Sequence, residues 1–318
     1  MRPWRLVGDA GGSNVRFARA SAGNVLAERR TYSVPHHASF YDALRLYLAE
    51  TGGPEGCASA AVGVAGPVDE GRVKLTNAPW TIDARDTAQA LGGAPTQLVN
   101  DLQAVALALP HLTEAELLPL GGAVRGSAPR QTMLALNVGT GFGGASCIPS
   151  RDSWMTVGSE PGHMTFGATD ADQLGVIQGC ASVEHLFSGR GVEALYARLA
   201  ARRGHGGGAP LKAAAIFANA AADAVAAETV QHFSVLLGRI AGDLVLAAGA
   251  WGGVYLCGSV VQGWAAVAGK EDFRAQFEAK GPMSARMQGV FSGVIRHDDV
   301  SLAGLTHLGI EGCALRGG

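Results

Sequence analysis

Residues 6–20 have the sequence LVGDAGGSNVRFARA, in which two apolar runs flank a short glycine-rich turn. Asp9 ends the first run, two glycines follow it, and Ser13 leads into the second run. Two apolar runs joined by such a turn are typical of a β-hairpin, so we expect two strands within residues 4–20. The turn also carries a carboxylate and a hydroxyl, which makes it a candidate for more than a change of chain direction.

A later segment, residues 132–149, repeats this arrangement with the sequence TMLALNVGTGFGGASCIP. An apolar run again meets a turn of small residues and a second apolar run, which predicts two related halves. Strand and helix patterns alternate along the rest of the chain, so the fold class is α/β. We expect further strands near residues 24–33, 57–66, 96–100 and 252–257, and helices within residues 39–50, 101–110, 182–204, 211–250 and 301–317.

The composition indicates a soluble protein that binds neither nucleic acid nor a membrane. The 318 residues suit one large or two medium domains. The net charge is −2 and no basic block is present, so nucleic-acid binding has little electrostatic support. Arg239 and Asp243 interrupt the most apolar late segment, and the N-terminus lacks a signal-peptide core, so we expect no membrane span.

The cysteines favour a reducing compartment. They are dispersed, odd in number, and none has the CxxC spacing of a zinc or redox site. We therefore expect a cytoplasmic protein in which most cysteines are small apolar residues.

Both glycine turns have the composition of phosphate-binding loops. Several N–H donors must converge on a phosphate, and glycine lets the backbone approach closely and adopt positive φ. A serine or threonine hydroxyl in each turn adds a donor. Asp9 would repel a triphosphate unless a cation lay between them, so the first turn also predicts Mg²⁺. The alternative is that each turn only reverses the chain, with its polar residues capping it.

The second turn also matches a different nucleotide motif. Gly139, Gly141 and Gly144 have the G-x-G-x-x-G spacing of a dinucleotide-binding turn, which must open a helix. Pro149 lies where that helix would run, and no acidic residue follows at the usual offset, so this interpretation is disfavoured. A P-loop is absent, because Glu271 follows the only Gly-Lys pair.

Asn100 and Asp101 lie where a strand is expected to end and a helix to begin. Ligands of α/β proteins gather at such carboxyl ends of strands. The Asp101 carboxylate could accept a proton from a hydroxyl that attacks phosphorus. It could equally cap the helix that follows.

Three further side chains could bind a sugar. Pro161 and Gly162 make a helix improbable between Glu160 and His163, so a tight loop would present a carboxylate and an imidazole side by side. Glu184 adds another possible acceptor for the adjacent hydroxyls of a sugar. The alternatives are an exposed helix residue for Glu184 and a backbone-bonded loop residue for His163.

Taken in order, a set of short segments resembles the bacterial glucokinases of the hexokinase-like group, within the actin-like ATPase and sugar kinase superfamily. The resemblance covers almost the whole chain and rests on the segments LVGDAGGSN, AGPV, LTNAPW, LVNDLQAVALALP, LNVGTGFGGA, SEPGHMTF, EHLFSGRGVEALY and YLCGSVV. Each motif is short, but their shared order and spacing are specific.

The resemblance implies two related α/β domains of the ribonuclease H-like, actin-like ATPase fold with a cleft between them. The small domain would comprise residues 1–110, completed by a C-terminal helix at 301–318, and the large domain residues 111–300. The implied reaction is ATP-dependent phosphorylation of D-glucose at O6, the first step of glycolysis. A homodimer is also implied.

The resemblance also assigns site residues. Asp101 would be the general base, and it would hold the sugar together with Asn77, Asn100, Glu160, His163 and Glu184. The ATP phosphates would lie on Gly8, Asp9, Ala10, Gly11, Gly12, Ser13, Gly139, Thr140 and Gly141. Gly258 would approach the adenosine, and Asp9 would lie near Mg²⁺, through water.

Three positions depart from the family pattern. Ser13 stands where threonine is usual, Pro161 where glycine is usual, and Ser259 where a second glycine is usual. Pro161 bears on the choice of hexose, and Ser259 on the choice of phosphoryl donor. The rival hypotheses are a kinase of another hexose or amino sugar, a nicotinamide-dependent oxidoreductase, and a sugar sensor, which would need a DNA-binding segment before the first strand.

Overall fold

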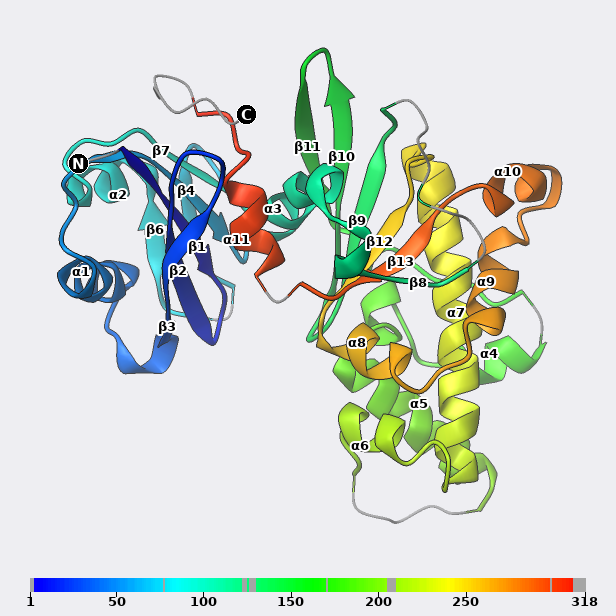
Figure 1. The fold of residues 1–318 in the computed structure, drawn as a ribbon. Coiled ribbons are helices and arrows are strands. Elements are labelled where there is room, and N and C mark those ends of the chain that lie inside the picture. Colours follow the sequence, from blue (N-terminus) through cyan, green and yellow to red (C-terminus); the bar gives the residue numbers. More distant parts are fainter. Residues whose placement is uncertain are drawn as a thin grey trace. The chain divides into compact units, whose positions relative to one another are not determined.

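The computed structural model describes residues 3–76, 78–121, 125, 130–169, 171–204, 210–297 and 299–310. The chain divides into two units (Figure 1). Unit 1 comprises Met1–His111 and Asp298–Gly318, and unit 2 comprises Leu112–His297. Unit 1 is therefore built from both ends of the chain.

Unit 1 contains a five-stranded sheet in the order β3-β2-β1-β4-β7. β1, β2 and β3 are antiparallel neighbours, whereas β1, β4 and β7 run parallel. The hairpin expected within residues 4–20 is confirmed. The strands are β1 Trp4–Ala10, β2 Asn14–Ala20, β3 Leu26–Ser33, β4 Cys57–Val64 and β7 Thr96–Asn100.

Helices cover both faces of this sheet. Leu6 on one face packs with α1 Phe40–Glu50, and Val7 on the other packs with α3 Asp101–Ala108 and α11 Val300–Leu305. The Ser39 hydroxyl caps α1 by accepting the Asp42 N–H at 3.1 Å. The small elements of unit 1 are the paired strands β5 Arg72–Lys74 and β6 Thr81–Asp83, helix α2 Ala84–Ala90, and the 3₁₀ turns Val34–His36 and Leu109–His111.

Unit 2 repeats the sheet of unit 1. Its strand order is β11-β10-β9-β12-β13-β8, in which β9, β10 and β11 are antiparallel and β9, β12 and β13 are parallel. Only β8, antiparallel to β13, has no counterpart in the sheet of unit 1. The predicted relation between the halves is thus confirmed at the level of topology. The strands are β8 Leu117–Pro119, β9 Met133–Val138, β10 Phe142–Ser150, β11 Ser153–Ser159, β12 Val254–Cys257 and β13 Ser292–Ile295.

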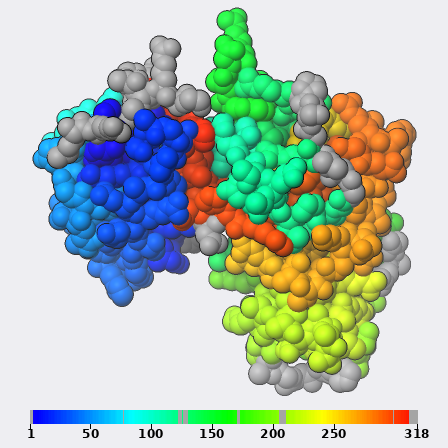
Figure 2. All heavy atoms as spheres, in the orientation of Figure 1, coloured from blue at the N-terminus to red at the C-terminus, as the bar shows by residue number. Residues whose placement is uncertain are grey.

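The β10–β11 hairpin projects from the sheet of unit 2, as the green spheres in Figure 2 show. Its outer strand has Met155 and Val157 about half exposed. The 3₁₀ turns of unit 2 are Glu114–Glu116, Pro161–His163, Val183–His185 and Gly281–Met283.

The helices of unit 2 surround one large core that includes Leu136 of β9. The helical region expected over 211–250 is interrupted, because the Asp223 carboxylate accepts the N–H groups of Val225 and Ala226 and so begins a new helix. The helices are α4 Ala171–Ile177, α5 Gly189–Arg202, α6 Ala213–Ala218, α7 Ala224–Ala248, α8 Ser259–Ala265, α9 Lys270–Glu278 and α10 Ser284–Gln288.

Helix α7, the long yellow helix in Figure 1, is long and apolar enough to cross a membrane by length and composition alone. However, 61% of its most apolar window is buried inside the protein. Phe233, Leu237 and Ile240 belong to the core of unit 2. Burial among other core residues accounts for the composition of α7.

The C-terminal helix is shorter than expected. Helix α11 ends at Leu305, and residues 306–310 are not helical, whereas a helix was expected to continue; residues 311–318 lie outside the described part. The buried guanidinium of Arg5 donates to the carbonyl oxygens of Thr306 and Leu308 at 3.0 and 2.7 Å. These carbonyls are thus satisfied by β1 instead of by a further helical turn.

Candidate functional site

The parallel strands of unit 1 end at one edge, and that edge carries two of the predicted site segments. Ala10 of β1 lies opposite Val64 of β4, which lies opposite Asn100 of β7. The first glycine turn and the Asn100-Asp101 pair therefore share an edge two strands apart, about 10 Å at the usual strand spacing. In the unit 1 sheet, the structure brings the predicted phosphate loop and the predicted base together.

The first glycine turn is closed by its own backbone. Gly11 N–H donates to the Asn14 carbonyl at 3.0 Å, and the Ser13 carbonyl accepts the Val34 N–H at 2.9 Å. Within the described residues, the N–H groups of Gly12 and Ser13 and the Ser13 hydroxyl have no protein acceptor. These three donors are available to an anion.

The expected positive φ values are not found in either turn. None of Gly11, Gly12, Gly139 and Gly141 has positive φ, so this part of the prediction is wrong. Of Gly11, Gly139 and Gly141, only Gly141 makes a close approach, since a Cβ atom there would lie 2.5 Å from an oxygen of Glu184, whereas Cβ atoms at Gly11 and Gly139 would have their nearest neighbours at 3.4 and 3.5 Å.

Asp9 is buried and pairs with Arg16, which the sequence reasoning missed. The two residues lie opposite each other in the hairpin, and the guanidinium contacts Asp9 Oδ2 at 2.5 Å. Asp299 lies 3.6 Å from Arg16 and 2.8 Å from Arg29, so charges alternate along this edge. The signal was present in the sequence, because a hairpin folded between Gly12 and Ser13 places residue 16 opposite residue 9.

The residues around Asp9 fit a magnesium ion that arrives with a nucleotide. Arg16 engages Oδ2 of Asp9, and no contact among the described residues engages Oδ1, which could accept a water of the ion. No group of three or more His, Cys, Asp or Glu able to hold a metal occurs in the part of the chain that the structure describes. Mg²⁺ commonly uses one or two carboxylates plus substrate phosphates and waters, so a single carboxylate beside the phosphate loop suits it.

Asn100, and not Asp101, caps helix α3. Asn100 Oδ1 accepts the Leu102 N–H at 2.9 Å, and the Gln103 side chain accepts the Asn100 N–H at 3.3 Å, forming a capping box. Asp101 is the first helical residue, half-buried, with Oδ1 2.9 Å from the Leu102 N–H. The helix cap, which was the alternative role for Asp101, is therefore Asn100.

In unit 2, the second glycine turn is locked and touches Glu184. Gly139 N–H donates to the Gly141 carbonyl, and the Gly139 carbonyl accepts the Gly189 N–H, both at 3.0 Å. Glu184 Oε2 accepts the Phe142 N–H at 2.9 Å. A residue predicted to hold the sugar is thus fixed against a turn predicted to hold phosphate.

Glu160 and His163 lie on the 3₁₀ turn expected to be a tight loop. Both are exposed, and across the described ranges neither side chain has a hydrogen-bond partner. Pro161 and Gly162 are buried beneath them, and a Cβ atom at Gly162 would lie 2.2 Å from the Phe142 carbonyl oxygen. The turn therefore sits directly on β10, beside Glu184, with its two polar side chains facing outward.

Gly258 follows β12 with a φ of 104°, which favours glycine. A Cβ atom there would lie 2.6 Å from the Val138 carbonyl oxygen, so the Gly258 and Gly139 turns are packed together. Ser259 begins α8 in an ordinary helical position. Asn77, the remaining predicted sugar ligand, lies outside the described residues.

The dinucleotide interpretation is wrong. The segment from Gly139 to Gly144 runs into β10, which is a strand, whereas a dinucleotide-binding turn must open a helix.

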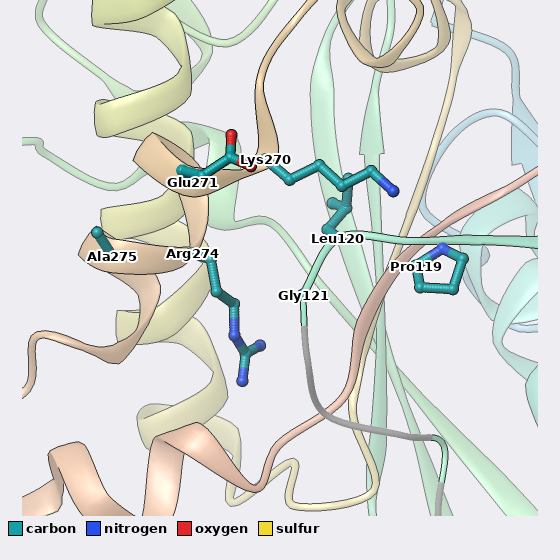
Figure 3. A pocket seen from close by; sticks show the side chains of 7 residues that line it. All are labelled: Pro119, Leu120, Gly121, Lys270, Glu271, Arg274 and Ala275. Carbon is teal, nitrogen blue, oxygen red and sulfur yellow. The ribbon is translucent and has the colours of Figure 1, made fainter.

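A pocket of about 430 Å³ lies elsewhere in unit 2 (Figure 3). It is lined by Pro119, Leu120, Gly121, Lys270, Glu271, Arg274 and Ala275, none of which is a predicted site residue. The Arg274 guanidinium donates to the carbonyls of Val290, Met287 and Gln288. The Arg274 guanidinium is therefore occupied in holding α10 and the segment that leads into β13, and this pocket is not the candidate site.

Comparison with known proteins gives consistent results. A family profile described as Glucokinase matches residues 6–310. The glucokinase of Chromobacterium violaceum is 38% identical over 290 residues, which cover 88% of this chain and 82% of that protein. The bifunctional protein glk of Burkholderia pseudomallei is 35% identical over 325 residues, which cover 99% of this chain and 50% of that protein. The chain thus spans half the length of that relative.

Among solved structures, the crystal structure of a glucokinase from an Antarctic psychrotroph is similar over nearly the whole chain. The TM-score is 0.85 and the sequence identity 30%, with 96% of this chain and 98% of that chain covered.

Proposed function

This chain belongs to the glucokinase family and is an ATP-dependent hexose kinase, and we propose that it transfers the γ-phosphoryl group of ATP to O6 of D-glucose with Asp101 as the general base. The observation that carries this proposal is the shared edge of β1, β4 and β7. The first glycine turn follows β1 and Asp101 follows β7, so both lie at the same edge of one sheet. Phosphoryl transfer to an alcohol requires a loop that binds phosphate and a base that accepts the alcohol proton, both held rigidly in place.

In the proposed reaction, Asp101 takes the O6 proton as that oxygen attacks phosphorus. Free N–H groups of Gly12 and Ser13, together with Thr140 in unit 2, would stabilise charge on the transferring phosphoryl group. Glu160, His163 and Glu184 would orient the sugar hydroxyls. Asp101 belongs to unit 1 and these three residues to unit 2, so catalysis would require residues of both units to bind the same sugar. Closure of the units on the sugar would exclude water.

Mg²⁺ belongs to the proposal as well. It would be held by the nucleotide phosphates and, through water, by Asp9, and it would neutralise charge as the phosphoryl group leaves. Arg16 keeps the Asp9 carboxylate oriented, since it holds one of the two carboxylate oxygens. Cytoplasmic location and a homodimer complete the proposal as predictions.

A panel of hexoses and amino sugars with ATP and Mg²⁺, monitored by ADP release, tests the activity and the acceptor together. We expect glucose to give the highest kcat/KM and EDTA to abolish turnover. Asp101→Asn keeps the shape of the side chain but removes the base, so kcat should fall about 10²- to 10⁴-fold while glucose binding persists. Near-normal turnover of Asp101→Asn would exclude the assigned role.

A kinase of another hexose or amino sugar is the second candidate, and Pro161 is the observation that favours it. Pro161 is buried, and a Cβ atom at Gly144 would lie 3.1 Å from its Cγ, so the sugar-binding turn is wedged onto β10. Pro161 also has no N–H to donate to a sugar. A different sugar with the highest kcat/KM in the panel would establish this candidate instead of glucokinase activity.

A further inference from the structure

The side chain of Asn137 lies between the two glycine turns of unit 2. Asn137 of β9 is the parallel partner of Cys257, the last residue of β12. A Cβ atom at Gly258 would lie 2.5 Å from Asn137 Oδ1, and one at Gly139 would lie 3.5 Å from Asn137 Nδ2. The amide is therefore in contact with both turns at once.

The orientation of Asn137 follows from the alternation of β9. Leu136 and Val138 are fully buried in the core of unit 2, whereas Asn137 is only partly buried. Successive side chains of a strand point to opposite faces, so Asn137 points away from that core. Its Oδ1 faces the Cys257 thiol at 3.9 Å, which leaves Nδ2 as the end of the amide without a protein partner among the described residues.

Few backbone donors of the second turn are left for a ligand. The Gly139 N–H is used by the Gly141 carbonyl, and the Phe142 N–H by Glu184. In the described part of the chain, the N–H groups of Thr140 and Gly141 have no protein acceptor. A polyphosphate offers only acceptors, so a side-chain donor beside the turn would add to a sparse set.

We propose that Asn137 is a nucleotide-binding residue whose Nδ2 donates a hydrogen bond to a phosphate oxygen of the nucleotide. The inference rests on the proposed function and on the expectation, from the family resemblance, that the Gly139–Gly141 turn and Gly258 lie at the nucleotide. A neutral amide suits this position because it supplies donors without adding charge. The thiol of Cys257 donates to Oδ1 at 3.9 Å, and Oδ1 also lies beside Gly258, so Nδ2 is the end of the amide that is left for a ligand.

Two variants remove the donor in different ways. Asn137→Asp preserves the shape and replaces Nδ2 with an oxygen, and Asn137→Leu preserves the approximate volume without any polar atom. Titration calorimetry with Mg²⁺ and a non-hydrolysable ATP analogue, in the absence of sugar, measures nucleotide binding directly. We expect the Kd of both variants to rise ~10-fold or more, as for the loss of a hydrogen bond to a charged group. Asn137→Ser, which keeps a short donor, should recover part of the affinity.

Glucose binding in the same variants is the internal control. A nucleotide-binding role leaves the glucose Kd and the melting temperature near those of the parent protein, because Asn137 is assigned no sugar contact. A purely structural role would instead lower the melting temperature and weaken glucose and nucleotide binding together, and this result would overturn the inference. Nucleotide binding within two-fold of the parent in both Asn137→Asp and Asn137→Leu would overturn it as well.

The experiments distinguish a failure of the Asn137 inference from a failure of the proposed function. If the parent protein binds the nucleotide analogue but phosphorylates no sugar, the kinase assignment fails while the Asn137 variants still test the contact. If the parent protein is an active kinase and the variants bind nucleotide normally, only the Asn137 inference fails.

Discussion

A Cβ atom at Gly141 would lie 2.5 Å from the Glu184 carboxylate, so a larger residue there would require Glu184 to move. Glu184 is held there by the Phe142 N–H, so the turn and the carboxylate position each other. Arg16 and Asp9 do the same in unit 1, where a buried carboxylate is held by the residue opposite it in the hairpin. Beside each glycine turn, one neighbouring group fixes a charged side chain: the Phe142 N–H fixes Glu184, and Arg16 fixes Asp9.

Gly141→Ala should therefore impair the proposed sugar site through Glu184. The added methyl group would force the carboxylate away and break its hydrogen bond to Phe142. We expect kcat/KM for glucose to fall ~10-fold or more, the effect of losing a hydrogen bond to a charged group. Gly289→Ala is the matched control, because its nearest neighbour would lie at an ordinary 3.5 Å. Equal kcat/KM in the two variants would show that Gly141 has no such role.

His307 makes the stability of unit 1 sensitive to pH. Its ring stacks on His111 with centroids 3.5 Å apart and planes within 4°. Burial, together with His111 and Arg5, lowers the pKa of His307 from 6.5 to about 4. Between these values the unfolded chain binds more protons than the folded one, so the free energy of unfolding decreases as the pH falls from 6.5 toward 4.

Replacement of His307 should flatten this dependence. His307→Phe keeps a ring on His111 but cannot be protonated, so its stability should fall less than that of the parent protein between pH 7 and pH 5. Urea denaturation at both pH values gives the two differences. His36→Gln, at an exposed histidine, should retain the parent slope. An equal loss of stability in His307→Phe and the parent would contradict the assignment.

At the scale of elements, helix α11 completes a sheet formed by the other end of the chain. Leu302 and Leu305 pack with Val7, Ala61 and Leu107 on the face of unit 1 that α3 also covers. The two helices meet with their backbones in contact, since a Cβ atom at Gly304 would lie 1.9 Å from the Ala104 carbonyl oxygen. A small residue is required at this crossing.

Gly304→Ala should destabilise the protein even though alanine favours helix formation. Helix propensity alone would stabilise the variant by about 1 kcal/mol. The clash with Ala104 should outweigh this gain, since overpacking costs about 1–3 kcal/mol. Chemical denaturation gives the sign directly. Gly309→Ala, where a Cβ atom would meet nothing within 4 Å, should leave stability nearly unchanged. A stabilised Gly304→Ala would show that the helices separate easily.

The elements themselves could largely be predicted from sequence. The hairpin strands and helix α1 were predictable because their apolar spacing is local, and Phe40, Leu44 and Tyr47 are all buried as that spacing requires. The early end of α11 was not predictable, because its carbonyls are taken by Arg5, which is remote in sequence.

The same distinction applies to the candidate site. The residue types and the turns were recognisable locally, but the contact between Glu184 and Phe142 depends on tertiary packing. The interruption of the predicted helical region at Asp223 is a local signal that could have been used, since aspartate is a favoured cap.

At the scale of the whole molecule, the two units differ in how the chain builds them. Unit 2 is one continuous segment, and its core draws only on residues between 112 and 297. Unit 1 is built from both ends of the chain, because α11 packs on Val7 and Ala61 of the sheet and on Leu107 of α3, which would lose this cover without it. Large exposed apolar patches are unfavourable in a soluble domain.

Separate expression of the segments tests this difference. A fragment of residues 112–297 should unfold cooperatively and give dispersed NMR amide signals. A fragment of residues 1–111 should not, unless a peptide of residues 299–310 is added. Cooperative thermal unfolding of residues 1–111 alone would show that α11 is dispensable for the fold of unit 1.

The bond from Arg5 to the backbone after α11 also sets an order of events on the ribosome. Arg5 leaves the exit tunnel 301 and 303 residues ahead of its acceptors Thr306 and Leu308. Unit 2 is synthesised complete before that point, so it is free to fold while the early sheet still lacks its closing helix. The nascent sheet is thus open to chaperones until helix α11 has been synthesised.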